Sequence, residues 1–301
     1  MEILKCENLK KQVKNKVIVE NISFSLDKGD IVGFIGPNGA GKTTTIKLIL
    51  GLIKLTEGKV YIDGYDIQKN FIKAMEKVGA IVETPDLYMY LNGYDNLKLT
   101  ANNYKSITKK RINEVIKMVG LENRIKDKVS TYSLGMRQRL GIAEAIINNP
   151  ELLILDEPTN GLDVEGTIEI RNLIKELSKE GIAILISSHN LTEIDNLCNR
   201  IIVIKNGRII TNDTIDNFKT FSNETTYVLE LDHLDNLDQV ILNYKYEIVS
   251  KNKIRVYISK EEMAKLMESL IKNKYQIYSM QEEKLTSEQA FMKKVGENKI
   301  D

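Results

Sequence analysis

The stretch GPNGAGKT at residues 36–43 decides the fold of this chain. It matches the pattern G-x-x-x-x-G-K-[ST], in which glycines let successive backbone N–H groups surround phosphate oxygens. The apolar run IVGFI at residues 31–35 precedes it and predicts a buried strand, and apolar residues at helical spacing follow over residues 45–52. A Gly-rich surface turn is the alternative, but the order of strand, loop and helix is the context that a P-loop requires.

The residues of this loop predict a site for nucleotide phosphates. Lys42 is expected to reach the β- and γ-phosphates of ATP, and the Thr43 hydroxyl is expected to bind Mg²⁺. The start of the following helix adds the positive end of its dipole. The predicted ATP-binding residues of the loop are Gly36, Pro37, Asn38, Gly39, Ala40, Gly41, Lys42, Thr43 and Thr44.

A second apolar run, LLILDE at residues 152–157, places two carboxylates at the end of a predicted strand. Asp156 is the Walker-B candidate that holds the metal, and Glu157 is the candidate general base for the attacking water. A strand that ends in Asp-Glu is a weak signal by itself, because many strands end in charged residues. It gains weight from the phosphate loop earlier in the same chain.

The spacing of the apolar runs predicts an α/β fold. Residues 152–155 and 182–187 have strand length, and a helical pattern at residues 164–179 separates them, which indicates a parallel sheet covered by helices. Alternation at residues 18–26 predicts a further strand. Residues 91–148 show helical periodicity without a convincing strand, and they predict an inserted helical subdomain.

A change of composition near residue 216 predicts two domains, 1–216 and 217–301, because glycine nearly disappears beyond it. The order of the later elements is βαββαβ, which predicts a small ferredoxin-like α+β domain. The predicted strands are 226–231, 247–250, 253–258 and 276–280, and the predicted helices are 234–242 and 260–272. Residues 286–292 (TSEQAFM) predict a short closing helix.

The composition limits the classes of function. The 301 residues include 43 Lys and Arg against 42 Asp and Glu, a net charge of +1, so no long-range field favours nucleic acid. With 42% apolar and 28% charged residues, the chain is typical of a globular protein. Cys6 and Cys198 make no disulfide framework, and neither a signal peptide nor an 18-residue apolar segment is found. We therefore expect a cytosolic chain that does not itself span membranes.

Further motifs resemble the ATP-binding subunit of an ABC transporter, over residues 1 to about 216. YSLGMRQRL at residues 132–140 resembles the ABC signature, which in this family binds the γ-phosphate held by the opposite subunit. GLD at residues 161–163 is similar to the D-loop, and His189 in SSHN looks like the switch histidine that contacts the γ-phosphate. The resemblance therefore adds these site residues: Ser133, Leu134, Gly135, Met136, Asp163 and His189. The alternatives are a simple helix N-cap at Ser133 and a structural role for His189.

Several positions depart from the usual pattern of the family, including Leu134 and Met136 of the signature, which replace a glycine and a glutamine. Glu83, in AIVETP at residues 80–85, stands where the Q-loop glutamine is expected, and it would add a negative charge beside Mg²⁺. We therefore include Glu83 among the candidate nucleotide and metal ligands, with a surface glutamate as the alternative. A glutamate here resembles the bacitracin- and lantibiotic-resistance branch. The aromatic residue that stacks on adenine is absent, because Val13 takes its place.

The resemblance implies a P-loop ABC-type ATPase domain with a parallel sheet, an antiparallel β-subdomain and the helical subdomain. It also implies hydrolysis of Mg²⁺-bound ATP, a homodimer that forms on ATP binding, and a separate membrane permease that docks near residues 83–96. The subunit would be cytoplasmic, held at the inner face of the plasma membrane, and would power export, with antimicrobial peptides or drugs as the expected cargo. No nucleic acid is expected as a partner.

Two alternatives share the ATPase chemistry. One is a soluble ABC-type ATPase that acts on ribosomes or DNA, although such proteins usually carry two P-loops or long inserted arms. The other is a sensor subunit that signals peptide attack and moves little cargo. Because the sensor shares every motif, the sequence does not separate it from a transporter.

Overall fold

Three apolar runs form the buried centre of a six-stranded sheet. Every residue of β3 (Ile31–Ile35), β7 (Leu152–Asp156) and β8 (Ala183–Ser188) is buried, as expected for strands covered on both faces. The strand order is β10-β9-β3-β8-β7-β6, which adds β6 (Val78–Ile81), β9 (Arg200–Lys205) and β10 (Arg208–Thr214). Each pair of neighbouring strands in the part β9-β3-β8-β7-β6 is parallel, whereas β10 is antiparallel to β9. The predicted parallel sheet is therefore mixed at one edge.

The computed structural model describes residues 1–219, 225–241, 244–283 and 291. The chain divides into two units, Met1–Thr214 and Ile215–Asp301. The predicted closing helix at residues 286–292 lies outside the described residues, apart from Phe291. Among the described residues no helix is long and apolar enough to cross a membrane, and Cys6 and Cys198 are free thiols.

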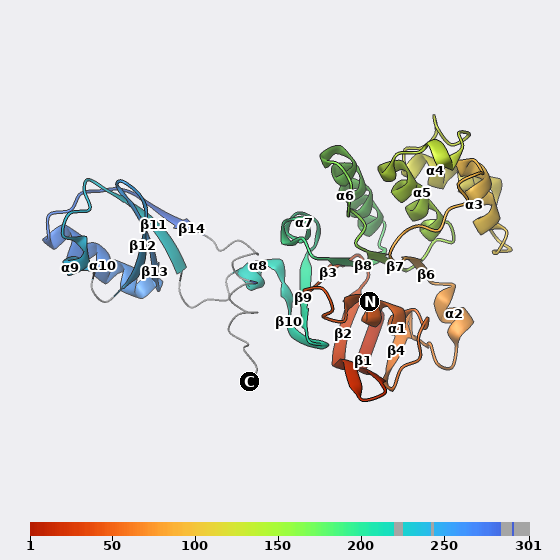
Figure 1. Ribbon diagram of the computed structural model, residues 1–301, viewed down its shortest axis with the longest axis horizontal. Coiled ribbons are helices and arrows are strands. Elements are labelled where there is room, and N and C mark those ends of the chain that lie inside the picture. The colour runs from red at the N-terminus through yellow and green to blue at the C-terminus, as the bar shows by residue number, and fades with distance from the viewer. Residues whose placement is uncertain (220–224, 242–243, 284–290, 292–301) are drawn as a thin grey trace. The chain divides into compact units, whose positions relative to one another are not determined.

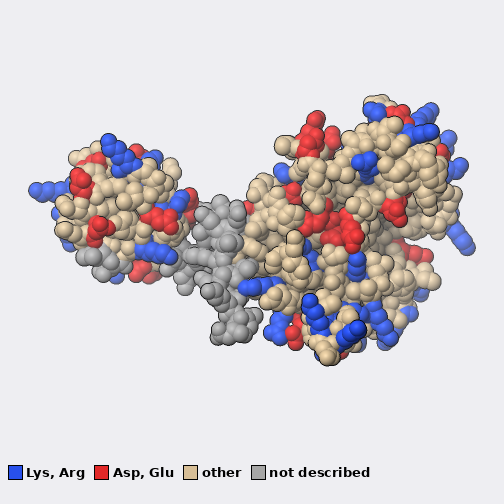
Figure 2. All heavy atoms as spheres, in the orientation of Figure 1, with Lys and Arg blue, Asp and Glu red and all other residues tan. Residues whose placement is uncertain are grey.

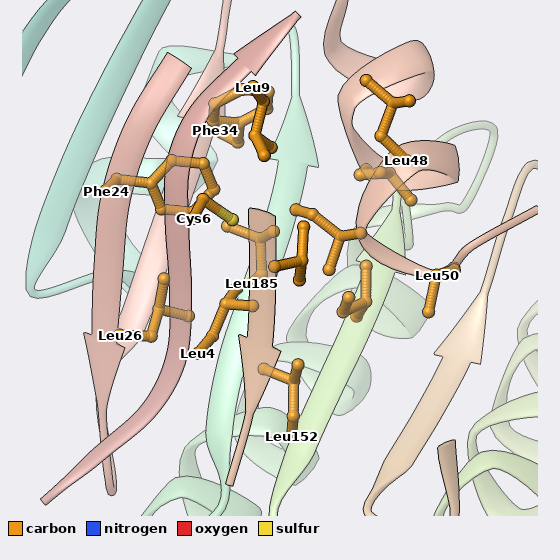
Figure 3. Packing of buried hydrophobic residues seen from close by; sticks show 14 of the residues in the cluster. Leu4, Cys6, Leu9, Phe24, Leu26, Phe34, Leu48, Leu50, Leu152 and Leu185 are labelled. Atoms are coloured by element: carbon orange, nitrogen blue, oxygen red, sulfur yellow. The ribbon is translucent and has the colours of Figure 1, made fainter. Parts of the chain in front are cut away.

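An antiparallel sheet and two helices cover one face of the central sheet in the larger unit (Figure 1). The sheet has the order β2-β1-β4-β5, and the helices are α1 and α2. Their bounds are β1 (Glu2–Val13), β2 (Lys16–Asp27), β4 (Glu57–Ile62), β5 (Tyr65–Asp66), α1 (Lys42–Ile49) and α2 (Phe71–Met75). Figure 3 shows Leu152 and Leu185 of the central sheet in the same cluster as Leu4 and Phe24. The predicted antiparallel subdomain is thus present.

Helices cover the other face. Leu153 and Leu155, which alternate with the residues of the first core, belong to a second core shared with these helices. The helices are α3 (Gly93–Ala101), α4 (Lys109–Met118), α5 (Leu134–Ile146), α6 (Val164–Lys179) and α7 (Leu191–Leu197), with a 3₁₀ turn at Val129–Thr131. The elements between residues 91 and 148 are helical, as the periodicity predicts.

The smaller unit contains a four-stranded antiparallel sheet of order β12-β13-β11-β14. Ile254, Val256 and Ile258 alternate along β13 and pack in one core with Met263, Leu266 and Leu270 of α10. The elements are α8 (Ile215–Lys219), β11 (Thr225–Leu231), α9 (Leu237–Val240), β12 (Lys245–Ser250), β13 (Lys253–Ile258), α10 (Lys260–Lys272) and β14 (Ile277–Glu283). From β11 onward their order is the predicted βαββαβ.

Candidate functional site

The phosphate loop leads directly into helix α1. Gly41 is the N-cap residue of α1 and has a φ of 108°, a left-handed conformation that favours glycine. The helix begins at Lys42 and ends at Ile49. The Lys42 side chain is buried, and its Nζ donates a hydrogen bond of 2.7 Å to the carbonyl oxygen of Gly36. The lysine side chain is therefore folded back over the loop, in the place that a phosphate would occupy.

Thr43 and Asp156 meet at the carboxyl end of the central strands. The Thr43 hydroxyl donates to Asp156 Oδ2 at 3.2 Å. Asp156 is buried, and its Oδ1 accepts a hydrogen bond from the Ser187 hydroxyl. A hydroxyl and a carboxylate side by side are oxygen ligands of the kind that Mg²⁺ prefers, and the open positions could be filled by water and phosphate oxygens. The residues present thus fit the predicted metal.

Glu157 and His189 form a pair beside this position. His189 Nδ1 lies 2.7 Å from Glu157 Oε2. Glu157 has a φ of 53°, and its backbone N–H donates to the carbonyl and the hydroxyl oxygen of Ser187, both at 3.1 Å. A non-glycine residue in the left-handed region is held there by its surroundings. Strands β7 and β8 thereby fix a carboxylate next to a histidine at one edge of the sheet.

One cavity of about 660 Å³ brings most of the predicted site residues together. Its walls contain all but Gly36 of the nine predicted loop residues, together with Glu83, Asp156, Glu157 and His189. Figure 2 shows acidic side chains gathered near the middle of the larger unit, next to where β3 and β8 lie in Figure 1. These carboxylates would repel a bound triphosphate unless a cation lay between them, because like charges repel.

Three residues of the cavity wall are absent from the sequence prediction: Ile18, Thr84 and Asn160. Thr84 is next to Glu83 and Asn160 follows Glu157 by three residues, so their nearness to predicted residues was a usable signal. Ile18 comes from β2, outside the central sheet, and its apolar side chain carried no such signal.

The signature residues and Asp163 lie outside this cavity and occupy helix starts. The Ser133 hydroxyl accepts from the backbone N–H of Met136 at 3.2 Å and caps α5. Asp163 Oδ1 accepts from the backbone N–H of Gly166 at 2.9 Å and caps α6. The N-cap interpretation of Ser133 is therefore correct as local structure. It leaves the free N–H groups at the start of α5 available to a ligand.

Glu83 is paired with a lysine. Its Oε1 lies 2.9 Å from the Nζ of Lys47, on the phosphate-loop helix. Two thirds of the Glu83 side chain is exposed, and its φ is 67°. An exposed ion pair of this kind contributes less than about 1 kcal/mol to stability. Its main effect is to place a compensating positive charge beside a carboxylate at the cavity wall.

A second cavity, of about 360 Å³, lies between β6, the loop after it, α3 and α5. We call it the Glu144 cavity; its titratable lining residues are Asp86, Tyr104 and Glu144. A Cβ at Gly79 would stand 1.9 Å from the carbonyl oxygen of Ala145, so only glycine lets β6 and α5 approach this closely. Burial, and to a smaller extent the charge of Asp86, raises the pKa of Glu144 to about 7 from 4.5.

Glu144→Gln is expected to stabilise the protein above pH 7. Because the pKa of Glu144 is higher in the folded chain, ionisation of this carboxyl costs stability as the pH rises from 4.5 through 7. The full shift would correspond to about 3 kcal/mol. Since the cavity is open to solvent, we expect a gain of about 1–2 kcal/mol at pH 8.

Urea unfolding of both proteins at pH 8 and pH 5 measures this gain, most of which should vanish at pH 5. Glu122→Gln is the matched control, because Glu122 is an exposed carboxylate of the same subdomain. A variant no more stable than the wild type at pH 8 would contradict the prediction.

Comparison with known proteins places the chain in a family. Residues 19–160 match the sequence profile of the ABC transporter family. The chain is 42% identical to the uncharacterised ABC transporter ATP-binding protein YhcH of Bacillus subtilis, over 99% of this chain and 97% of the relative. It is 38% identical to the bacitracin transport ATP-binding protein BcrA of Bacillus licheniformis, over 98% and 97%.

A solved structure supports the same placement. A dimeric bacterial ABC transporter cassette matches with a TM-score of 0.64 and 29% identity, over 71% of this chain and 99% of the cassette. The matched length agrees with the size of the larger unit. The predicted resemblance is thereby confirmed: the chain belongs to the ABC transporter family, as an ATP-binding subunit that hydrolyses ATP to ADP and phosphate.

Proposed function

We propose that the chain powers a membrane exporter of antimicrobial peptides or related drugs by hydrolysing Mg²⁺-bound ATP in the larger cavity. The observation that carries the chemistry is the contact of 2.7 Å between Glu157 and His189 beside the phosphate loop. Mg²⁺ would offset charge on the phosphates, with Thr43 and Asp156 as its protein ligands. Lys42 would turn from the Gly36 carbonyl oxygen to the β- and γ-phosphates.

Glu157 is the proposed general base. It would accept a proton from the water that attacks the γ-phosphorus, while the bond to the β-phosphate oxygen breaks and ADP leaves. His189 would hold the Glu157 carboxylate through Nδ1 and contact the γ-phosphate through the rest of its ring. The strained backbone of Glu157, held by Ser187, would keep the carboxylate in place through the cycle.

Glu83 is proposed to exchange Lys47 for the metal or its water when ATP binds. Glu83→Gln is then expected to raise the Mg²⁺ concentration for half-maximal ATPase activity by about 3- to 10-fold, since a neutral amide binds Mg²⁺ less strongly than a carboxylate. Lys47→Gln, which removes the competing cation, should shift it the other way. Titration of ATPase activity with Mg²⁺ tests both, and an unchanged midpoint in both variants would leave Glu83 as a surface residue.

A homodimer is proposed for the ATP-bound state. Ser133, Leu134, Gly135 and Met136 do not line the cavity that holds the phosphate loop, so one chain would not bring its own signature to its own ATP. Leu134, Val164 and Ile168 are exposed apolar residues at the starts of α5 and α6. A second chain, related by a two-fold axis, would cover these residues and place its α5 start and Asp163 against the nucleotide.

The proposed partner is a separate membrane permease, docked around residues 83–96 and the helical subdomain. This would hold the subunit on the cytoplasmic face of the plasma membrane.

Similarity to the bacitracin transport protein BcrA over nearly the full length supports antimicrobial peptides as cargo. Deletion of the coding sequence from its host tests this, because sensitivity to bacitracin and related peptides should rise at least fourfold. The wild-type chain should restore resistance, but Glu157→Gln should not, and unchanged sensitivity to every peptide would refute the cargo.

The C-terminal residues 217–301 are proposed as an accessory domain with a ferredoxin-like fold. The βαββαβ order and the sheet order β12-β13-β11-β14 support this topology. Its core, shared by the sheet and α10, supports a domain that is separate from residues 1–216.

A further inference from the structure

The Glu144 cavity contains negative charge without a matching positive charge. Its titratable lining residues are two carboxylic acids and a phenol, Asp86, Glu144 and Tyr104. Among the ion pairs of the described residues, none involves Asp86 or Glu144. The hydrogen bond that the Glu144 carboxylate receives comes from the neutral Thr100 hydroxyl, at 3.2 Å.

The arginine on the neighbouring helix α4 is already engaged. Arg111 donates to the carbonyl oxygens of Ile146 and Ile147, at 2.7 and 3.3 Å, and lies 3.8 Å from Glu114. These contacts hold its guanidinium at the end of α5 and beside Glu114, and among the ion pairs of the described residues none joins Arg111 to Glu144. A half-buried carboxylate without a cation is costly, and a cation from another molecule would remove that cost.

Exposed apolar side chains follow the cavity residue Asp86 in the sequence. Tyr88, Met89 and Tyr90 follow Asp86 in the loop and are 52%, 39% and 70% exposed. The buried side chain of Asn96 fixes this segment to α3, because it accepts from the Tyr88 backbone N–H at 2.8 Å and donates to the Tyr88 carbonyl oxygen at 3.2 Å. A prearranged apolar surface beside an acidic hollow matches a short amphipathic segment with a basic residue.

We propose that the Glu144 cavity receives an arginine or lysine side chain from the docking segment of the permease, with Glu144 as its ion-pair partner and Asp86 as a second carboxylate. This inference rests on the proposed permease partner and adds the chemistry by which the partner is recognised. An anionic segment is excluded by the sign of the charge, and a purely apolar segment would leave the carboxylates buried without compensation.

The first experiment compares three tagged full-length proteins: the wild type, Glu144→Gln and Glu122→Gln. Each is used to capture partners from detergent-solubilised membranes of its own host in the presence of ATP. The wild type and Glu122→Gln should retain the same multi-span membrane protein in equal yield, and Glu144→Gln should retain at least 10-fold less. Glu144 does not line the nucleotide cavity, so the ATPase activity of isolated Glu144→Gln should stay within twofold of the wild type.

The second experiment identifies the cation. A photo-crosslinking amino acid at position 90 attaches to the docking segment, which mass spectrometry then locates in the captured protein. Glu144→Lys should abolish capture, and exchange of the basic residue in the crosslinked segment for glutamate should restore it. A crosslinked segment without arginine or lysine would overturn the inference.

The outcomes separate this inference from the function on which it rests. Equal capture of the membrane protein by Glu144→Gln and the wild type would overturn the cation pairing and leave the permease standing. If the wild type captures no multi-span membrane protein, the proposed permease partner fails and the inference fails with it. Loss with Glu144→Gln followed by charge-exchange rescue supports both.

Discussion

Glu157→Gln is expected to lower the rate of ATP hydrolysis by at least about 100-fold while ATP still binds with wild-type affinity. Glutamine has nearly the same shape as glutamate, so the contact with His189 and the backbone hydrogen bonds to Ser187 can persist. The amide oxygen, however, does not accept a proton from water at neutral pH. Replacement of one carboxylate oxygen by an amide nitrogen is therefore expected to remove the proton acceptor and to leave ATP binding intact.

The same substitution should trap a dimer. Contacts that exist only in the ATP-bound state hold the two chains together, and hydrolysis removes them. Size-exclusion chromatography with light scattering should give a dimer for Glu157→Gln with ATP and Mg²⁺, and a monomer without nucleotide. Single-turnover hydrolysis and the affinity for a fluorescent ATP analogue complete the measurement.

Glu151→Gln is the matched control, because Glu151 immediately precedes β7, at the opposite end from Glu157. It should hydrolyse ATP at the wild-type rate and form no stable dimer. Hydrolysis by Glu157→Gln within fivefold of the wild type would remove Glu157 from the role of general base and assign proton transfer to another group.

The convergence of the site was predictable because parallel strands share one direction. The phosphate loop follows β3, Asp156 ends β7 and His189 follows β8, so an α/β fold brings all three to the same edge of the sheet. Local patterns predicted each of these strands, and the shared direction of the parallel strands explains why their carboxyl ends lie together. By contrast, β9 and β10 are not among the predicted elements, although Ile201, Ile202, Val203 and Ile204 form a buried apolar run.

Pairs that depend on tertiary packing were not predictable. Lys47 and Glu83 lie 36 residues apart, and no periodicity links a partly exposed lysine of α1 to a loop after β6. The sequence suggested an uncompensated charge at Glu83, and the ion pair changes that expectation. Glu144 did carry a signal, because it lies four residues after the buried Leu140 on the core-facing side of α5. The depth of the cavity around it follows only from the packing of α3, α5 and β6.

Lys42→Ala is expected to weaken ATP binding by at least about 100-fold, or about 2.7 kcal/mol. The Lys42 ammonium is buried and hydrogen-bonds to the Gly36 carbonyl oxygen at 2.7 Å. A carbonyl oxygen is a neutral acceptor, whereas the β- and γ-phosphates offer charged oxygens at the start of a helix. When ATP binds, the ammonium would exchange the neutral acceptor for a charged one, and this gain contributes to the free energy of binding. Alanine has no ammonium and makes no such contribution.

Loss of the Lys42 stem could also disturb the loop, and a second variant separates the two effects. Lys42→Met keeps the buried methylene chain, so it should unfold at the wild-type urea midpoint and still bind ATP at least about 100-fold more weakly. Lys69→Ala, at an exposed position in the same unit, should bind ATP normally. Calorimetric titration of the three variants with ATP and Mg²⁺ decides the matter. Tight binding by Lys42→Met would mean that the backbone N–H groups of the loop hold the nucleotide alone, because the ammonium is then the one group that has been removed.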